Sequence, residues 1–445
     1  MMKTLLLAGA TGLATISLAR AADVPMEAAE AVEYVKVCTE FGEGFFYIPG
    51  TDTCLRLSGH VRADYRFQDH DSDTYSTNTT TFGGNARLNI DARTATEYGT
   101  LRSFVELNTA VVSSTSSGAR LGKAYIQLGG LTAGFAASAF NFYDTNYANT
   151  IFAGYFAPYN TVNLISYTAT FGGGFYATLS IEDGMARRGD TDAFFGDIDG
   201  DGIFPTAGAP VMVSAEVEGH DIPDIVAAIG ASQSWGNAQV MAAIHNIDAR
   251  ATFGTIAPAD VRVEGDEWGY AVGAGVGINL PIAAGGHFAI EAVYADGALD
   301  YLGDAGGLVA DHVITYDGFN TAAVGDDLFA VDTTSGWSVT GEVQVRFSPA
   351  LVGSAFGSYV SIDAAGAYAP ASGSSITDIE SYILGANLVY TITRGLTVGA
   401  EVSYRNTETD SISRSFVAAA PVNALVTTSV EDEQLNFGVR LERRW

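Results

Sequence analysis

Residues 55–67 alternate strictly between apolar and polar positions. One face carries apolar or small side chains, and the other carries Arg56, Ser58, His60, Arg62, Asp64 and Arg66. Because successive side chains of a β-strand point to opposite sides, the pattern predicts a strand with one apolar and one charged face. Such a strand fits a soluble sheet whose charged face meets water. It equally fits a membrane barrel whose charged face lines a lumen.

The same period of two recurs along the chain. A second strand is expected over residues 85–93, with Arg87 and Arg93 on its polar face, and a third over 101–108, with Arg102. Further segments of this kind lie at residues 123–128, 131–138, 162–170, 175–183, 224–234, 237–246, 268–279, 287–294, 337–347, 351–362, 380–391, 396–406 and 435–445. The pattern therefore predicts about sixteen strands.

Short connections between these segments alternate with long ones, among them residues 68–81, 139–160, 184–223, 295–336 and 406–434. Short turns at one end and long loops at the other are typical of outer-membrane barrels. An open sheet of this size would leave two unpaired edges, which closure removes and which lipid forbids. Aromatic residues near strand ends fit interfacial girdles. We therefore predict an all-β fold, a transmembrane antiparallel barrel of about sixteen strands.

The composition narrows the function classes. The chain has 22 Lys and Arg against 51 Asp and Glu, a formal charge of −29. This balance argues against nucleic acid as a partner, because phosphate binding needs basic surface. Beyond the N-terminus no apolar run approaches the roughly 20 residues of a membrane helix. At 445 residues the chain could hold two or three soluble domains or one large barrel.

The N-terminus has the features of a signal peptide over residues 1–21. Lys3 precedes an apolar core, and Ala19-Arg20-Ala21 forms a small-x-small cleavage site. A membrane anchor is the alternative, although the apolar core is short for one. Residues 22–54 then form an N-terminal segment, and residues 55–445 form the predicted barrel.

Cys38 and Cys54 are the only cysteines. In an exported chain an even count suggests a disulfide, with two free thiols as the alternative. In the chain-entropy model, closing a loop of about 15 residues contributes roughly 3 kcal/mol.

Several segments resemble the porin family of alphaproteobacterial outer membranes. The likeness is carried by Val35-Lys36-Val37-Cys38, by residues 44–62, by Ala124-Tyr125-Ile126-Gln127 with Thr132-Ala133-Gly134, and by the final strand ending at Trp445. The resemblance implies a sixteen-stranded barrel, usually a trimer, for passive diffusion of small hydrophilic solutes. It also implies that the third long loop, residues 139–160 here, folds into the lumen. Phe135 stands where members often carry a basic residue.

A channel needs a wet lumen and a field across its narrowest point, and no catalytic group. The candidate wall and constriction residues are Arg56, His60, Arg62, Arg66, Arg87, Arg93 and Arg102, facing Asp144 of the third loop. The alternative is that these arginines are solvated or pair with Asp64, Asp91 and Glu106. We expect a porin, not an enzyme, in contact with lipid, lipopolysaccharide and further copies of itself. A barrel used for adhesion through its long acidic loops is the second hypothesis, and a membrane-embedded enzyme the third.

The segment Asp197-Ile198-Asp199-Gly200-Asp201-Gly202 resembles the start of a calcium loop. Carboxylates at alternate positions followed by glycine suit a hard, oxygen-seeking cation. The twelfth position is Gly208, so the usual glutamate is missing, and an acidic surface loop is the alternative. No other cofactor is expected. The glycine-rich residues 273–277 look briefly like a dinucleotide loop, but they continue a strand pattern.

Overall fold

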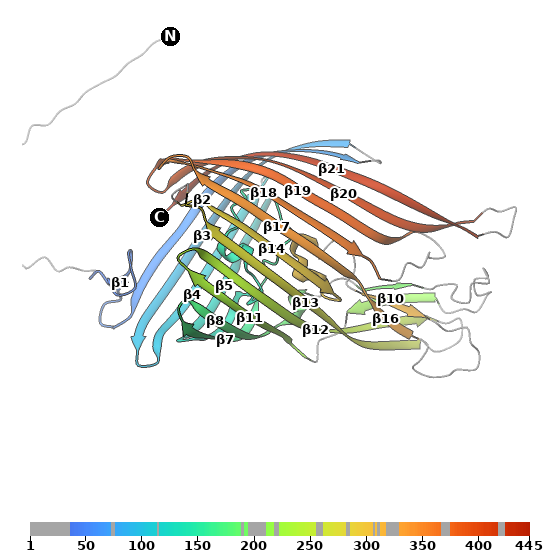
Figure 1. Ribbon diagram of the computed structural model, residues 1–445, viewed down its shortest axis with the longest axis horizontal. Helices are drawn as coiled ribbons and strands as arrows, with labels where there is room; N and C mark the ends of the chain where they lie inside the picture. Colours follow the sequence, from blue (N-terminus) through green and yellow to red (C-terminus); the bar gives the residue numbers. More distant parts are fainter. Residues whose placement is uncertain are drawn as a thin grey trace, which may run out of the picture.

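In the computed structural model the wall of a barrel is built from sixteen antiparallel strands, counted over the described residues (Figure 1). The described residues are 36–72, 76–113, 115–187, 191–194, 211–217, 222–254, 261–281, 285–305, 308, 312–316, 329–365, 374–416 and 423–445. The wall strands are β2 Cys54–Ser72, β3 Ser76–Thr96, β4 Gly99–Val112, β5 Thr115–Leu128, β6 Leu131–Ala137, β7 Thr161–Gly172, β8 Phe175–Glu182, β11 Asp224–Gln233, β12 Gly236–Gly254, β13 Val261–Asn279, β14 His287–Asp296, β17 Ser335–Arg346, β18 Leu351–Asp363, β19 Ser374–Thr393, β20 Leu396–Phe416 and β21 Asn423–Arg444.

The first and last wall strands close the barrel. β2 pairs with β21 in a register that runs from His60 opposite Arg444 to Ser72 opposite Asp432. Each remaining wall strand pairs with the next wall strand along the chain. Closure satisfies the backbone groups that a sheet edge would leave unpaired in lipid. The prediction of a closed, all-β transmembrane barrel is confirmed. Each of the sixteen predicted segments falls on a wall strand, and five of them extend one residue past its end.

The predicted loops at residues 68–81 and 406–434 are largely wrong. β2 continues to Ser72 and β3 starts at Ser76, while β20 continues to Phe416 and β21 starts at Asn423. β20 is 21 residues long, whereas about 9–11 residues cross a bilayer. These strand ends therefore project beyond the membrane, where both faces meet water. The alternation disappears there although the ladder of backbone hydrogen bonds continues.

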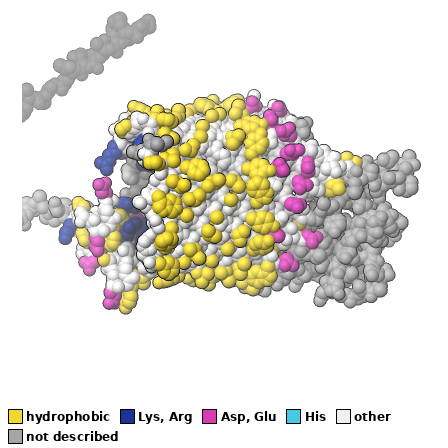
Figure 2. All heavy atoms as spheres, viewed as in Figure 1, with side chains coloured by type: hydrophobic (Ala, Val, Ile, Leu, Met, Phe, Trp, Pro, Cys, Tyr) yellow, Lys and Arg dark blue, Asp and Glu magenta, His cyan; other side chains and the backbone are white. Residues whose placement is uncertain are grey.

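The outer face of the wall is apolar. Leu57 and Val61 point outward from β2 and keep about half of their surface exposed, 48% and 50%. Figure 2 shows the resulting hydrophobic band across the visible face of the barrel, with acidic side chains gathered along one edge. Outward aromatic rings contact one another from strand to strand, as in Tyr270–Tyr294, Trp337–Tyr359 and Tyr382–Tyr404. This pattern is that of a surface in contact with lipid.

The long connections hold short elements of their own. They include α1 Tyr143–Asn146, the 3-10 turns η1 Gly184–Arg187 and η2 Leu299–Ala305, and β10 Val211–Val217, which pairs with β12. A second small sheet joins β9 Thr191–Phe194, β15 His312–Tyr316 and β16 Phe329–Thr333. The predicted loops 184–223 and 295–336 therefore contain regular structure. No described helix is long and apolar enough to cross a membrane.

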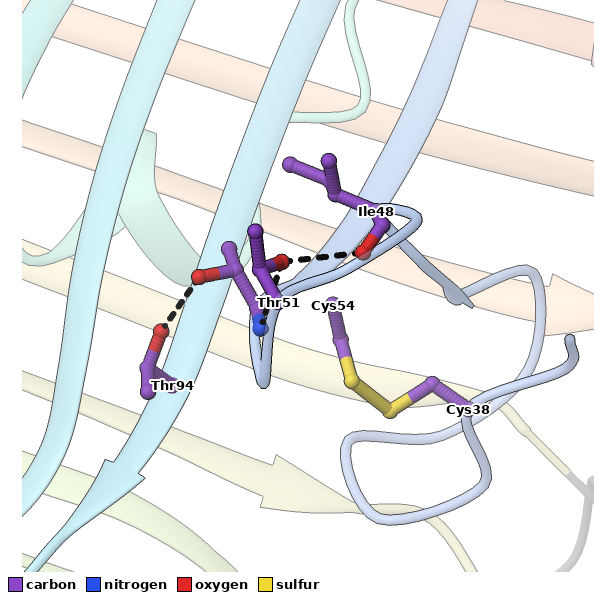
Figure 3. The surroundings of a disulfide bond; sticks show 6 residues. Cys38, Ile48, Thr51, Cys54 and Thr94 are labelled. Carbon is purple, nitrogen blue, oxygen red and sulfur yellow. Dashed lines mark hydrogen bonds between the residues drawn. A yellow bond between two sulfur atoms is a disulfide. The ribbon is translucent and has the colours of Figure 1, made fainter. Parts of the chain in front are cut away.

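The N-terminal segment is attached to the rim of the barrel by a disulfide between Cys38 and Cys54 (Figure 3). β1, Phe46–Tyr47, pairs with the start of β2, and both cysteines are buried together with Phe45. The predicted disulfide is confirmed. The disulfide lies at the end of the barrel that has the short turns. The C-terminus lies at the same end, since Trp445 N donates to Gly59 O at 3.2 Å. In outer-membrane barrels this end faces the periplasm.

Candidate functional site

Residues 138–160, which join β6 to β7, cross the interior of the barrel. Their backbone N–H groups bond to carboxylates on distant strands. Tyr143 N donates to Glu291 of β14 at 2.8 Å, and Asn149 N donates to Glu342 of β17 at 3.0 Å. Ile151, Phe152 and Ala153 all donate to Glu401 of β20, at 2.6, 2.7 and 2.7 Å. A loop bonded to three strands on the far side of the wall must run through the lumen, as the resemblance implies.

Glycines on the inner wall receive the loop's large side chains. A Cβ added at the glycine would lie 2.1, 1.9 and 2.3 Å from a ring atom in the pairs Gly275–Phe142, Gly277–Tyr147 and Gly438–Phe152. Any larger residue would push these rings away. The glycine-rich residues 273–277 thus belong to β13 and make room for the loop. This recess explains a pattern that sequence alone left without a role.

A second layer supports the loop on one side. The ring of Phe140 lies 4.7 Å from that of Tyr301 in η2, and the Tyr159 hydroxyl donates to Asp304 at 2.8 Å. Beneath them lies a buried ionic cluster centred on Asp224, which pairs with Arg187 and His245 and accepts a hydrogen bond from Tyr301. This side of the lumen is therefore filled by protein, and open space is left toward the opposite wall.

The opposite wall, on β2, β3 and β4, carries the predicted arginines. Arg56, Arg93 and Arg102 all approach one carboxylate, Asp91, at 3.4, 2.8 and 2.9 Å. The ring of Phe45 also lies 4.8 Å from Arg56 and 5.0 Å from Arg93. These three guanidinium groups are thus grouped near the disulfide end of the barrel, and among the described residues Asp91 is the one carboxylate that forms ion pairs with them.

The remaining predicted residues lie further along the same wall. Arg62 pairs with Glu442, Arg87 pairs with Glu106 at 3.4 Å, and His60 Nε2 lies 2.9 Å from Asn85 Oδ1. Asp64 is shared by Arg66 at 3.6 Å and Arg440 at 2.8 Å. The alternative of pairing with wall carboxylates is thus partly realised. Among the described residues eight arginines share four carboxylates, so this part of the wall keeps a positive charge: Arg56, Arg62, Arg66, Arg87, Arg93, Arg102, Arg440 and Arg444 against Asp64, Asp91, Glu106 and Glu442.

Asp144 stands on the loop side of the open space. It accepts a hydrogen bond from the Tyr155 hydroxyl at 2.5 Å. Burial raises the pKa of Asp144, while this hydrogen bond and the positive charges of Lys123 and Arg87 act in the opposite direction. The loop carboxylate therefore feels the field of the basic wall. Whether the predicted residues set ion selectivity stays a prediction.

Sequence reasoning missed the three loop-binding glutamates. Each one is a single acidic residue among the inward positions of its strand, which is a weak signal. The candidate calcium residues Asp197, Asp199 and Asp201 lie outside the described residues. Within the residues that are described, no group of three or more His, Cys, Asp or Glu side chains could hold a metal ion.

A family model described as a porin subfamily matches residues 23–435. Porin Omp2b of Brucella abortus is 38% identical over 255 residues, which cover 53% of this chain and 63% of that protein. The match thus spans a little under two thirds of the length of the curated relative.

Two solved structures resemble the barrel. The outer membrane channel DcaP of Acinetobacter baumannii matches with a TM-score of 0.56 at 15% identity, over 88% of this chain and 99% of that chain. An anion-selective porin from Comamonas acidovorans matches with a TM-score of 0.50 at 10% identity, over 88% and 100%. At these identities the likeness shows the fold alone.

Proposed function

This chain belongs to the porin subfamily, and from that premise we propose that it forms a water-filled channel for passive diffusion of small hydrophilic solutes and ions. Its barrel lies in the bacterial outer membrane. Conduction through it needs a polar lumen and a field across the narrow part, and no chemical step at any side chain. We therefore propose that the protein is not an enzyme.

One observation supports an open channel over a plugged one. The inward-facing side chains of Arg56, Arg87 and Arg66 keep 36%, 39% and 44% of their surface exposed. These guanidinium groups point away from lipid, so the solvent that reaches them is inside the barrel. A barrel used only for adhesion has no need of charged side chains facing internal water.

The test is electrical. Purified protein in planar bilayers should give stepwise conductance increments in potassium chloride, and in liposomes it should pass small sugars faster than large ones. Insertion of folded barrels without conductance steps would reject the channel. In that case, binding through the long acidic loops would become the leading function.

We propose that the channel is a homotrimer whose contact face lies on β3, β4 and β5. Most outward side chains there are exposed and aliphatic, in contrast to the ring contacts on β13 to β20: Leu88, Leu101, Leu107, Leu121 and Ile126. The exception is Phe82 of β3, whose ring contacts Tyr65 of β2. Aromatic rings anchor a barrel at lipid interfaces, so a face with aliphatic side chains suits contact with another copy. Leu107→Trp should lower the temperature at which the trimer dissociates, whereas Leu384→Trp on β19 should not. A monomeric mass in mild detergent would contradict the trimer.

We also propose that lipopolysaccharide contacts the acidic edge of the hydrophobic band, through divalent cations. Carboxylates on β18, β19, β20 and β21 are exposed near the outward aromatic rings, at Asp363, Glu380, Glu408 and Glu433. Carboxylate and phosphate oxygens are preferred ligands of calcium and magnesium. Chelation in outer-membrane fragments should therefore lower the heat stability of the wild type. If chelation leaves the heat stability of the wild type unchanged, the proposed contact with lipopolysaccharide is rejected.

A further inference from the structure

A cavity of about 120 Å³ lies where the tip of the loop meets β2, β20 and β21. Its lining includes Arg66, Phe152, Ile383, Glu401, Arg405 and Asn436. Phe152 comes from the loop, and the other five come from the wall. The cavity therefore exists only because the loop is docked, and it lies beside the open part of the lumen.

The cavity holds positive charge with little compensation. Arg66 shares Asp64 with Arg440, which is the nearer partner at 2.8 Å against 3.6 Å. Arg405 donates from Nε to Thr407 at 3.3 Å, and among the described residues no carboxylate forms an ion pair with it. Two guanidinium groups thus face one small space with donors to spare.

Glu401 lines the same cavity without cancelling this charge. Its two oxygens already accept three backbone N–H groups of the loop and one from the Asn387 side chain at 3.1 Å. Each such donor stabilises the carboxylate and occupies a lone pair that an arginine could have used. The carboxylate is therefore committed to the loop.

The cavity also has an apolar side. The Phe152 ring has Arg66 at 4.5 Å and Arg440 at 4.7 Å from its centroid, and Ala153 and Ile383 extend the apolar part of the lining. A planar, fixed fork of N–H groups suits the two oxygens of a carboxylate. Apolar side chains next to that fork suit a short hydrocarbon tail, which inorganic phosphate lacks.

We propose that this cavity binds a small carboxylate with a short aliphatic tail, held by Arg66 and Arg405 while the solute crosses the channel. The proposal rests on the proposed function and adds a solute class to it. Losing one of the two charged hydrogen-bond donors should weaken binding about tenfold or more.

Butyrate is the probe. Single channels are recorded in potassium chloride while sodium butyrate is added, and the current should fall to a plateau. The half-blocking concentration should rise about tenfold in Arg405→Gln and in Arg66→Gln. It should stay unchanged in Arg443→Gln, a matched arginine on the outer face near the chain end. Acetate and phosphate should block at higher concentrations than butyrate.

Calorimetry with butyrate and purified protein gives a second readout that needs no conduction. If the protein releases heat on binding butyrate but does not conduct, the binding site in the cavity stands and the proposed channel is rejected. If the protein conducts but shows neither a saturable block by butyrate nor heat on adding it, the butyrate site is rejected and the proposed channel stands. Equal block in the arginine variants, or phosphate blocking as well as butyrate, would overturn the assignment.

Discussion

Replacing Glu401 with glutamine should release the tip of the lumen loop. In the wild type this carboxylate accepts three backbone N–H groups, from Ile151, Phe152 and Ala153. A hydrogen bond to a charged group contributes about 1.5–3 kcal/mol, and the glutamine keeps one acceptor oxygen in place of two. Losing even two of the charged bonds weakens the attachment by about 3 kcal/mol or more. That change raises the population of the detached tip by a factor of more than about 100.

The assay is single-channel recording of the variant beside the wild type. The Glu401→Gln channel should show a larger mean conductance and more current noise, because the loop samples positions outside its wild-type site. Glu433→Gln, which removes an exposed carboxylate from the outer face of β21, is the matched control. If conductance and noise are the same in all three proteins, the loop is held by its packed rings, and the carboxylate contributes nothing to its position.

Four further changes test other parts of the structure. Replacing Arg62 and Arg87 with glutamine should raise cation preference, and unchanged reversal potentials would remove both from the selectivity filter. Gly438→Leu should raise conductance, because the new side chain occupies the recess of a loop ring, whose nearest atom lies 2.3 Å from an added Cβ; an unchanged current would contradict this fit. Cys38→Ser should lower the unfolding temperature by removing up to roughly 3 kcal/mol, and an unchanged temperature would show that the disulfide adds no stability. Since burial raises the pKa of Asp144, mild acid should neutralise this carboxylate before an ordinary aspartate and so increase anion preference. If the Asp144→Asn variant shows the same increase in anion preference on acidification, another group is responsible for it.

The strands could be predicted because each wall strand has two solvents. Lipid on one side and water on the other impose a period of two, as in residues 55–67, and that period also fixes which arginines face inward. The prediction failed where both solvents are water. At the ends of β2 and β20 the backbone ladder continues, but no side-chain pattern marks it.

The docking of the loop could not be predicted in the same way. Which strands residues 138–160 reach depends on closure of the whole barrel, and no local signal specifies that Glu291, Glu342 and Glu401 will meet its backbone. The glycine recesses have the same origin. Gly275 and Gly438 are needed because rings from a remote segment occupy the space of their missing side chains, and a single sequence contains no sign of this contact.

The docked loop also fixes the sign of the charge in the lumen. Glu291, Glu342 and Glu401 face inward, and without the loop they would oppose the arginines across the barrel. The loop's N–H groups bind all three, so the charge that remains open to water is that of the arginine wall. Detaching the tip should therefore uncover a carboxylate as well as widen the passage. Widening alone would raise conductance and leave the charge balance of the lumen as it was. The Gly438→Leu variant distinguishes widening of the passage from exposure of the carboxylate. If the carboxylate is exposed, the reversal potential should shift toward cation preference as the conductance rises. A larger conductance at an unchanged reversal potential would mean that the loop narrows the passage without setting its charge.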